Sequence, residues 1–161
     1  MKTSNVLLTA LVLSAALALP GRAAADQGIA AGGAAGTYPP ATTFAGVAIS
    51  AIQSGFGADI DLGGTGRGQF CAILLGVSSL GLEQNVKIEG QVTGASQLAP
   101  NIAVLSGVAS IDLGDGLPPA EGIPFTATLT ANADGGGTIG LVTGLASLPD
   151  ATIIAGSLAI R

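Results

Sequence analysis

Four carboxylates have the residue type and spacing to bind a ligand; they are Asp59, Asp61, Asp112 and Asp115. The first two precede a glycine-rich run, GGTGRG at 63–68, and the second two border or enter another loop, GDGLPPAEG at 114–122. Residues two apart on a strand point to the same face. Calcium prefers several oxygen ligands from Asp, Asn and main-chain carbonyls in a flexible loop. The four aspartates are therefore candidate calcium ligands.

The same aspartates have a simpler interpretation as turn residues. Asp and Asn commonly accept hydrogen bonds from their own main chain in turns, and Asn132 and Asp134 at the tip of ANADGGGT have the same character. The EF-hand spacing is absent from the sequence. GGTGRG does not open a helix, as a dinucleotide fingerprint must, and it has no Lys followed by Ser or Thr, as a P-loop must. A turn and a calcium loop remain the two alternatives.

The remaining chemistry of the chain argues against an enzyme. There is no His, so neither a Ser-His-Asp nor a Cys-His arrangement can be built. Cys71 lies in the apolar run QFCAILLGV and is expected to be a buried small hydrophobe. Paired carboxylates could hydrolyse glycosides, but sugar sites usually use aromatics, and the chain has only four Phe and one Tyr. A carboxylate-based hydrolase is the second alternative.

The N-terminal segment predicts export. An apolar run from Val6 to Leu19 follows Lys2, and it is shorter than the roughly 20 residues of a membrane helix. Ala23 and Ala25 have the A-x-A spacing of a signal peptidase site. We expect a signal peptide over 1–25, cleavage before Asp26, no membrane span afterwards, and a secreted, periplasmic or extracellular product. A retained N-terminal anchor is the alternative.

Cleavage would leave three basic residues against all ten acidic ones. Three scattered cations cannot form a basic patch, so nucleic acid is not an expected partner. A single Cys cannot form an internal disulfide, so the core alone must stabilise the fold. We expect no cofactor, calcium being the exception if the aspartate loops bind it.

The rest of the sequence predicts an all-β fold. Residues 26–41 lack periodicity and are interpreted as a flexible linker, followed by a single β-domain over 42–161. PFTATLTANA alternates strictly, with Phe125 and Leu129 on one face and threonines on the other. Similar runs occupy 44–53, 58–62, 69–77, 86–92, 102–113, 138–143 and 152–160. About eight short strands favour an antiparallel β-sandwich or a closed barrel.

Four sequence pairs recur in the same order, which predicts a duplicated β-unit. The pairs are IDLG (60–63 and 111–114), FCAIL and FTATL (70–74 and 125–129), GQVTGAS and GLVTGLAS (90–96 and 140–147), and NIAVLSGVASI and ATIIAGSLAI (101–111 and 151–160). The predicted core comprises Phe70, Ile88, Val92, Ile111, Phe125, Leu129, Ile154 and Leu158. The last run carries no charge between Asp150 and Arg161, so it is either a central strand, which we favour, or an exposed edge that pairs with a neighbour.

These observations predict a secreted, non-catalytic module of structural, cell-surface or protein-interaction type. Its partner would be an unknown protein, a cell surface or a second copy of itself. An exported domain that binds calcium or a small ligand through its Asp-rich loops is the alternative function.

Overall fold

A computed structural model describes residues 28–61 and 63–161, and over these residues the chain forms one antiparallel sheet of nine strands. The strands are β1 (Gly28–Thr37), β2 (Thr43–Phe44), β3 (Val47–Ile60), β4 (Thr65–Val77), β5 (Val86–Ala99), β6 (Ile102–Asp112), β7 (Ala120–Ala131), β8 (Gly137–Thr143) and β9 (Ala151–Ile160). The all-β prediction is confirmed.

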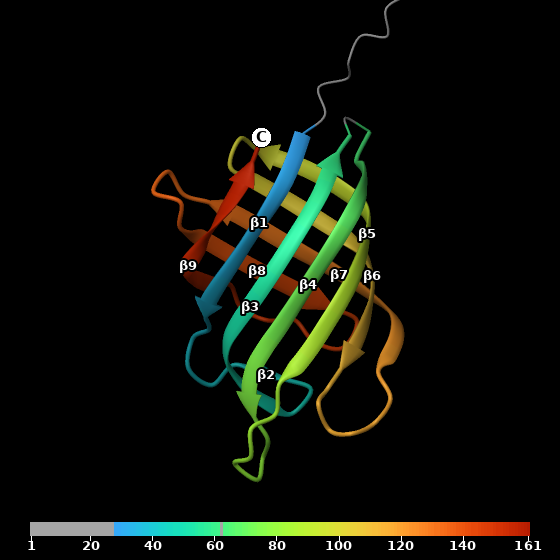
Figure 1. Cartoon of the computed structure of the whole chain (residues 1–161), viewed down its shortest axis with the longest axis vertical. Helices are drawn as coiled ribbons and strands as arrows, with labels where there is room; N and C mark the ends of the chain where they lie inside the picture. Colours follow the sequence, from blue (N-terminus) through green and yellow to red (C-terminus); the bar gives the residue numbers. More distant parts are fainter. Residues whose placement is uncertain (1–27, 62) are drawn as a thin grey trace, which may run out of the picture.

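The sheet closes on itself, because β1 pairs with both β3 and β9. Hydrogen bonds therefore run in a ring through eight strands, with β2 attached to β3. The ring is not an even barrel: only Thr138–Thr152 and Ile139–Ala151 join β8 to β9. In Figure 1, β6, β7 and β8 cross behind β1, β3 and β4, so the core lies between two crossed layers.

Side chains at alternate positions along the strands point inward and fill this core. On β4, Phe70 and Leu74 are buried, and on β7 Phe125 and Leu129 are buried while the threonines between them are partly exposed. The rings of Phe70 and Phe125 stack with their centroids 5.5 Å apart and an interplanar angle of 25°. The predicted core is confirmed at every position except Ile154, which is exposed.

A β-bulge explains the exposure of Ile154. Opposite β1, the register passes from Ile153 directly to Ala155, so Ile154 has no partner residue. An inserted residue shifts the alternation of inward and outward side chains. Ile154 therefore turns outward, and Leu158 returns to the core.

The prediction of a flexible linker over 26–41 is wrong for Gly28–Thr37, which forms β1. Its glycines and alanines give no hydrophobic contrast, but they let β1 fit between β3 and β9. A Cβ on Gly36 would lie 2.9 Å from the carbonyl oxygen of Thr152. The described sheet therefore begins before residue 42, and Tyr38, just after β1, is buried.

The prediction that Cys71 is buried is also wrong. Phe70 and Ala72 take the inward positions on β4, so Cys71 faces outward and is exposed. Its Sγ donates a hydrogen bond to the carbonyl oxygen of Gly55, 3.2 Å away. The uniformly apolar run around Cys71 concealed this alternation.

The recurring sequence pairs begin on strands that are three apart in the chain or, for Asn101, one residue before such a strand: β3 and β6, β4 and β7, β5 and β8, and β6 and β9. The stacked Phe70 and Phe125 begin one of these pairs. Duplication itself stays a prediction.

The predicted signal peptide, 1–25, lies outside the described residues. Over 28–61 and 63–161, no helix is long and apolar enough to cross a membrane.

Candidate functional site

The glycine-rich stretch after Asp59 is a hairpin turn between β3 and β4. The main-chain N–H of Gly64 donates a hydrogen bond to the carbonyl oxygen of Asp61 (3.0 Å). The N–H of Asp61 donates one to the carbonyl oxygen of Thr65 (3.0 Å). Gly64 has a φ of 74°, a conformation that glycine adopts without steric cost. The loop leads into a strand and not into a helix, so its main-chain N–H groups lack the helix N-terminus that holds phosphate in nucleotide sites.

The first aspartate pair lies at this turn. Asp59 is exposed on β3, opposite Arg67 on β4. Asp61 comes one residue after the end of β3, and its Oδ2 accepts a hydrogen bond from the Thr65 hydroxyl at 3.0 Å. This bond holds the two ends of the turn together.

The second pair lies at the end of β6, where Asp112 is the last residue, and in the β6–β7 loop, where Asp115 follows. Oδ1 of Asp112 accepts a hydrogen bond from the N–H of Gly114 (2.9 Å), and Oδ1 of Asp115 accepts one from Leu117 (3.0 Å). Oδ1 of Asp134, at the β7–β8 turn, accepts one from Gly136 in the same way (3.0 Å). All three bonds are the side-chain-to-main-chain contacts that Asp makes in turns.

The structure does not bring the two aspartate pairs together. Asp61 lies near Thr65, which pairs with Gly94 of β5, whereas Asp112 pairs with Lys87 at the opposite end of β5. Figure 1 shows the two loops at opposite ends of the ring. Among the described residues, no group of three or more His, Cys, Asp or Glu side chains could hold a metal ion. Each pair would have to bind calcium on its own, and calcium binding stays the alternative that the sequence left open.

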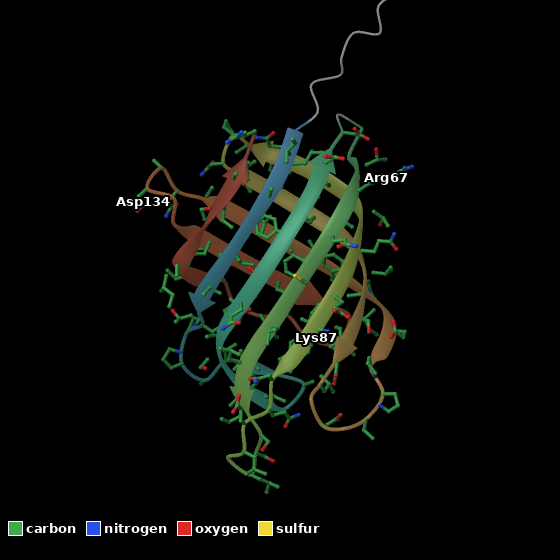
Figure 2. All side chains as sticks on the ribbon, in the orientation of Figure 1. Arg67, Lys87 and Asp134 are labelled. Atoms are coloured by element: carbon green, nitrogen blue, oxygen red, sulfur yellow. The ribbon has the colours of Figure 1, made fainter. Side chains whose placement is uncertain are left out.

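The cations are equally dispersed over the described surface. Figure 2 shows Arg67 near one end of the ring and Lys87 near the other. Lys87 Nζ forms an ion pair with Glu89 Oε1 at 2.8 Å on the exposed face of β5. The hydrogen bond and the charge of Glu89 raise the pKa of Lys87. An exposed pair of this kind contributes little to stability.

The sequence analysis did not predict the leucines exposed on the loops at the lower end of the ring in Figure 1. Leu80 and Leu82 lie in the β4–β5 loop, and Leu117 lies in the β6–β7 loop. The loops adjoin, because Nε2 of Gln84 donates to the carbonyl oxygen of Leu113 at 2.8 Å. We call Leu80, Leu82 and Leu117 the lower-end leucines. The sequence did contain a signal for these exposed leucines, because they lie within the turn sequences SSLGLEQN and GDGLPPAEG. Polar residues usually occupy such turns.

The lower-end leucines are strongly exposed. Their exposed fractions are 83% for Leu80, 66% for Leu82 and 67% for Leu117. Leu80 and Leu82 share one loop, and Leu117 lies on the loop that adjoins it. No family model, no curated protein and no solved structure matches this chain.

Proposed function

We propose that the chain is an exported, non-catalytic β-module that docks to a protein or a cell surface through its lower-end leucines. The observation that carries the proposal is the exposure of three large apolar side chains on two adjoining loops. Complete burial of a leucine side chain contributes about 1.5–3 kcal/mol, so a partner that covers all three gains several kcal/mol toward the cost of association.

The ring of strands suits this role. Loops held by a closed sheet present their side chains in a fixed arrangement, which lowers the entropy lost on binding. Two contacts restrain the β4–β5 loop further: the N–H of Gly81 donates to the carbonyl oxygen of Ser78 (2.9 Å), and that of Ser78 donates to Leu82 (2.8 Å). The leucines between and beside these contacts project from an ordered turn.

The test compares binding to the washed surface of the cells that produce the protein. Replacing Leu80, Leu82 and Leu117 by Ser should weaken binding about tenfold or more, which corresponds to about 1.4 kcal/mol. The matched control replaces Leu98 and Val142 by Ser, because both are exposed apolar residues outside these loops. Equal binding by the triple variant, or cell-surface binding that the control abolishes, would contradict the proposal.

A further inference from the structure

A hollow of about 600 Å³, open to solvent, lies between β4 and β5 next to the β3–β4 turn. Its polar lining consists of Asp61, Thr65, Arg67, Gln91 and Thr93. Figure 2 shows Arg67 near the upper end of the ring, away from Lys87 and the lower-end leucines. The volume is within the range of small-molecule sites in proteins. We call this hollow the Arg67 hollow.

A β-bulge in β5 shapes the Arg67 hollow. Between β4 and β5, no residue pair joins positions 66–67 to Thr93. Between β5 and β6, the register passes from Val92 directly to Gly94, so Thr93 has no partner residue on that side either. Bulges are common at the rims of barrels and next to functional sites, where they redirect a side chain. Here the bulge leaves Thr93 exposed at the hollow.

The main chain beside Arg67 is held in place by close packing. A Cβ on Gly66 would lie 2.7 Å from the carbonyl oxygen of Asp59 and 2.9 Å from the main-chain nitrogen of Ala95. Only glycine fits there without a shift of the neighbouring strands. The Arg67 side chain is exposed, but it therefore starts from a fixed point at the hollow.

The lining side chains have hydrogen-bonding groups to offer a ligand. Over 28–61 and 63–161, the side chains of Arg67, Gln91 and Thr93 form no hydrogen bond or ion pair with the rest of the chain. The hydroxyl of Thr65 donates to Asp61 at 3.0 Å, so its lone pairs still accept hydrogen bonds. The hollow thus presents one cation, one amide and two hydroxyl groups.

These groups indicate the class of ligand. The planar guanidinium of an arginine binds a carboxylate through two parallel hydrogen bonds, and amide and hydroxyl groups bind hydroxyls. Asp61 lines the same hollow, and Asp59 lies opposite Arg67 on β3. Both repel a second negative charge on the ligand. None of the described residues that line the hollow is aromatic, so a sugar ring would find no stacking platform.

We propose that the Arg67 hollow binds a small open-chain hydroxycarboxylate, with its single carboxylate on Arg67 and its hydroxyl groups on Gln91, Thr93 and Thr65. The site lies apart from the lower-end leucines, so it goes beyond the proposed docking function. Loss of either activity would leave the other intact, and the two are tested separately.

The first test is calorimetric titration with D-gluconate, using the chain with the N-terminus that its producing cell leaves on it. Sorbitol has the same carbon chain without the carboxylate, and acetate has the carboxylate without the hydroxyl groups. We expect both to bind at least about tenfold more weakly than gluconate. Inorganic phosphate should also bind more weakly, because Asp61 and Asp59 disfavour its second charge. Acetate or phosphate binding as tightly as gluconate would overturn the proposed ligand class, and glucuronate binding more tightly would assign the site to a ring.

The second test changes the cation. Arg67→Gln should raise the dissociation constant for gluconate about tenfold or more, and Arg67→Lys should recover part of the loss because it keeps the charge without the planar fork. Lys87→Gln is the matched control, since it removes an exposed cation of β5 that does not line the hollow. Its affinity should match that of the unaltered chain. An equal loss in Lys87→Gln and Arg67→Gln would show general charge attraction and no site.

The third test removes a hydroxyl group. Thr93→Val keeps the size of the side chain, and it should weaken gluconate about threefold or more while leaving the affinity for acetate unchanged. Thermal melts of each variant check that the fold persists, as expected for exposed positions. Two outcomes overturn the proposal altogether. One is no heat of binding up to about 10 mM gluconate, where a site with a dissociation constant of about 1 mM is almost fully occupied. The other is gluconate binding that neither Arg67→Gln nor Thr93→Val weakens.

Discussion

The hydroxyl group of Tyr38 is buried within the closed sheet, and within the described residues it has no hydrogen-bond partner. A buried polar group without a partner costs about 1–3 kcal/mol. Tyr38→Phe keeps the ring of the side chain in the core and removes the hydroxyl. We expect this variant to raise the free energy of unfolding at pH 7 by about 1 kcal/mol, measured by urea denaturation. A loss of stability would mean that the hydroxyl has a partner.

The same hydroxyl predicts a loss of stability in alkali. Burial, and then the charge of Asp150, raise the pKa of Tyr38 far above its usual value. The unfolded chain releases this proton near pH 10, whereas the folded chain keeps it. Stability is therefore full below about pH 10 and falls as pH rises above it, by up to about 1.4 kcal/mol per pH unit. Tyr38→Phe should remove this slope. Tyr38 is the only Tyr in the chain, so tyrosinate absorbance follows its ionisation directly.

The packing of Phe125 on β7 explains a glycine on β5, two strands away in the sheet. A Cβ on Gly90 would lie 2.6 Å from Cε1 of Phe125. Gly90→Ala should therefore cost about 1–3 kcal/mol through overpacking, and Phe125→Ala about 3–5 kcal/mol through loss of a buried aromatic. In the double variant, the smaller side chain at 125 makes room for the new methyl group. The combined loss, measured by urea denaturation, should be smaller than the sum. Simple additivity would show that the two positions do not interact.

At the scale of single strands, the bulge in β9 leaves one large apolar side chain of that strand exposed and another buried. Ile154 is 67% exposed and Leu158 is 7% exposed. Ile154→Ala should change the free energy of unfolding by less than about 0.5 kcal/mol, and Leu158→Ala should lower it by about 2–5 kcal/mol. Thermal and urea melts of both variants test the position of the bulge. Equal losses would place both side chains in the core.

Strand β1 should be essential for folding. It is the element that pairs with both β3 and β9, so its removal exposes two strand edges and breaks the ring. A chain that lacks residues 1–37 should be unfolded by circular dichroism, whereas a chain beginning at Asp26 should fold. A folded, monomeric product of the shorter chain would show that β3 and β9 can close the ring without it.

The strands could be predicted from sequence where inward and outward residues differ in polarity. On β7, Thr126, Thr128 and Thr130 alternate with apolar residues, and the prediction succeeded. On β1 every residue from Gly28 to Gly36 is apolar or Gly, so alternation left no trace. The bulge at Ile154 is a main-chain event that depends on the partner strand, and local sequence does not encode the partner.

The candidate sites were also predictable only where local sequence determines the structure. The turn role of Asp112 and Asp115 follows from short-range chemistry, and the sequence anticipated it as one alternative. The separation of these residues from Asp59 and Asp61 depends on how β4, β5 and β6 pair, which local spacing does not reveal. The exposure of Leu117 went unpredicted because its contacts with the rest of the chain are set by tertiary structure.

For the whole molecule, the placement of acidic residues at opposite ends predicts indifference to calcium. A protein that binds calcium only when folded gains stability as the ion concentration rises. Here three of the aspartates already accept hydrogen bonds within their turns. The melting temperature should be the same with millimolar calcium and with a chelator. A rise of several degrees that Asp59→Asn/Asp61→Asn or Asp112→Asn/Asp115→Asn removes would instead establish a calcium loop.

The adjacency of Ile29 and Arg161, which are joined by two main-chain hydrogen bonds, determines how the molecule responds to force. A load applied between residues 28 and 161 acts across the β1–β9 ladder from its end, so its hydrogen bonds break in succession. Strands pulled lengthwise past each other would have to break all their bonds together. The chain should therefore peel open at low force when held by these two residues. The same fold should resist far more strongly when it is held at positions that shear β3 against β4.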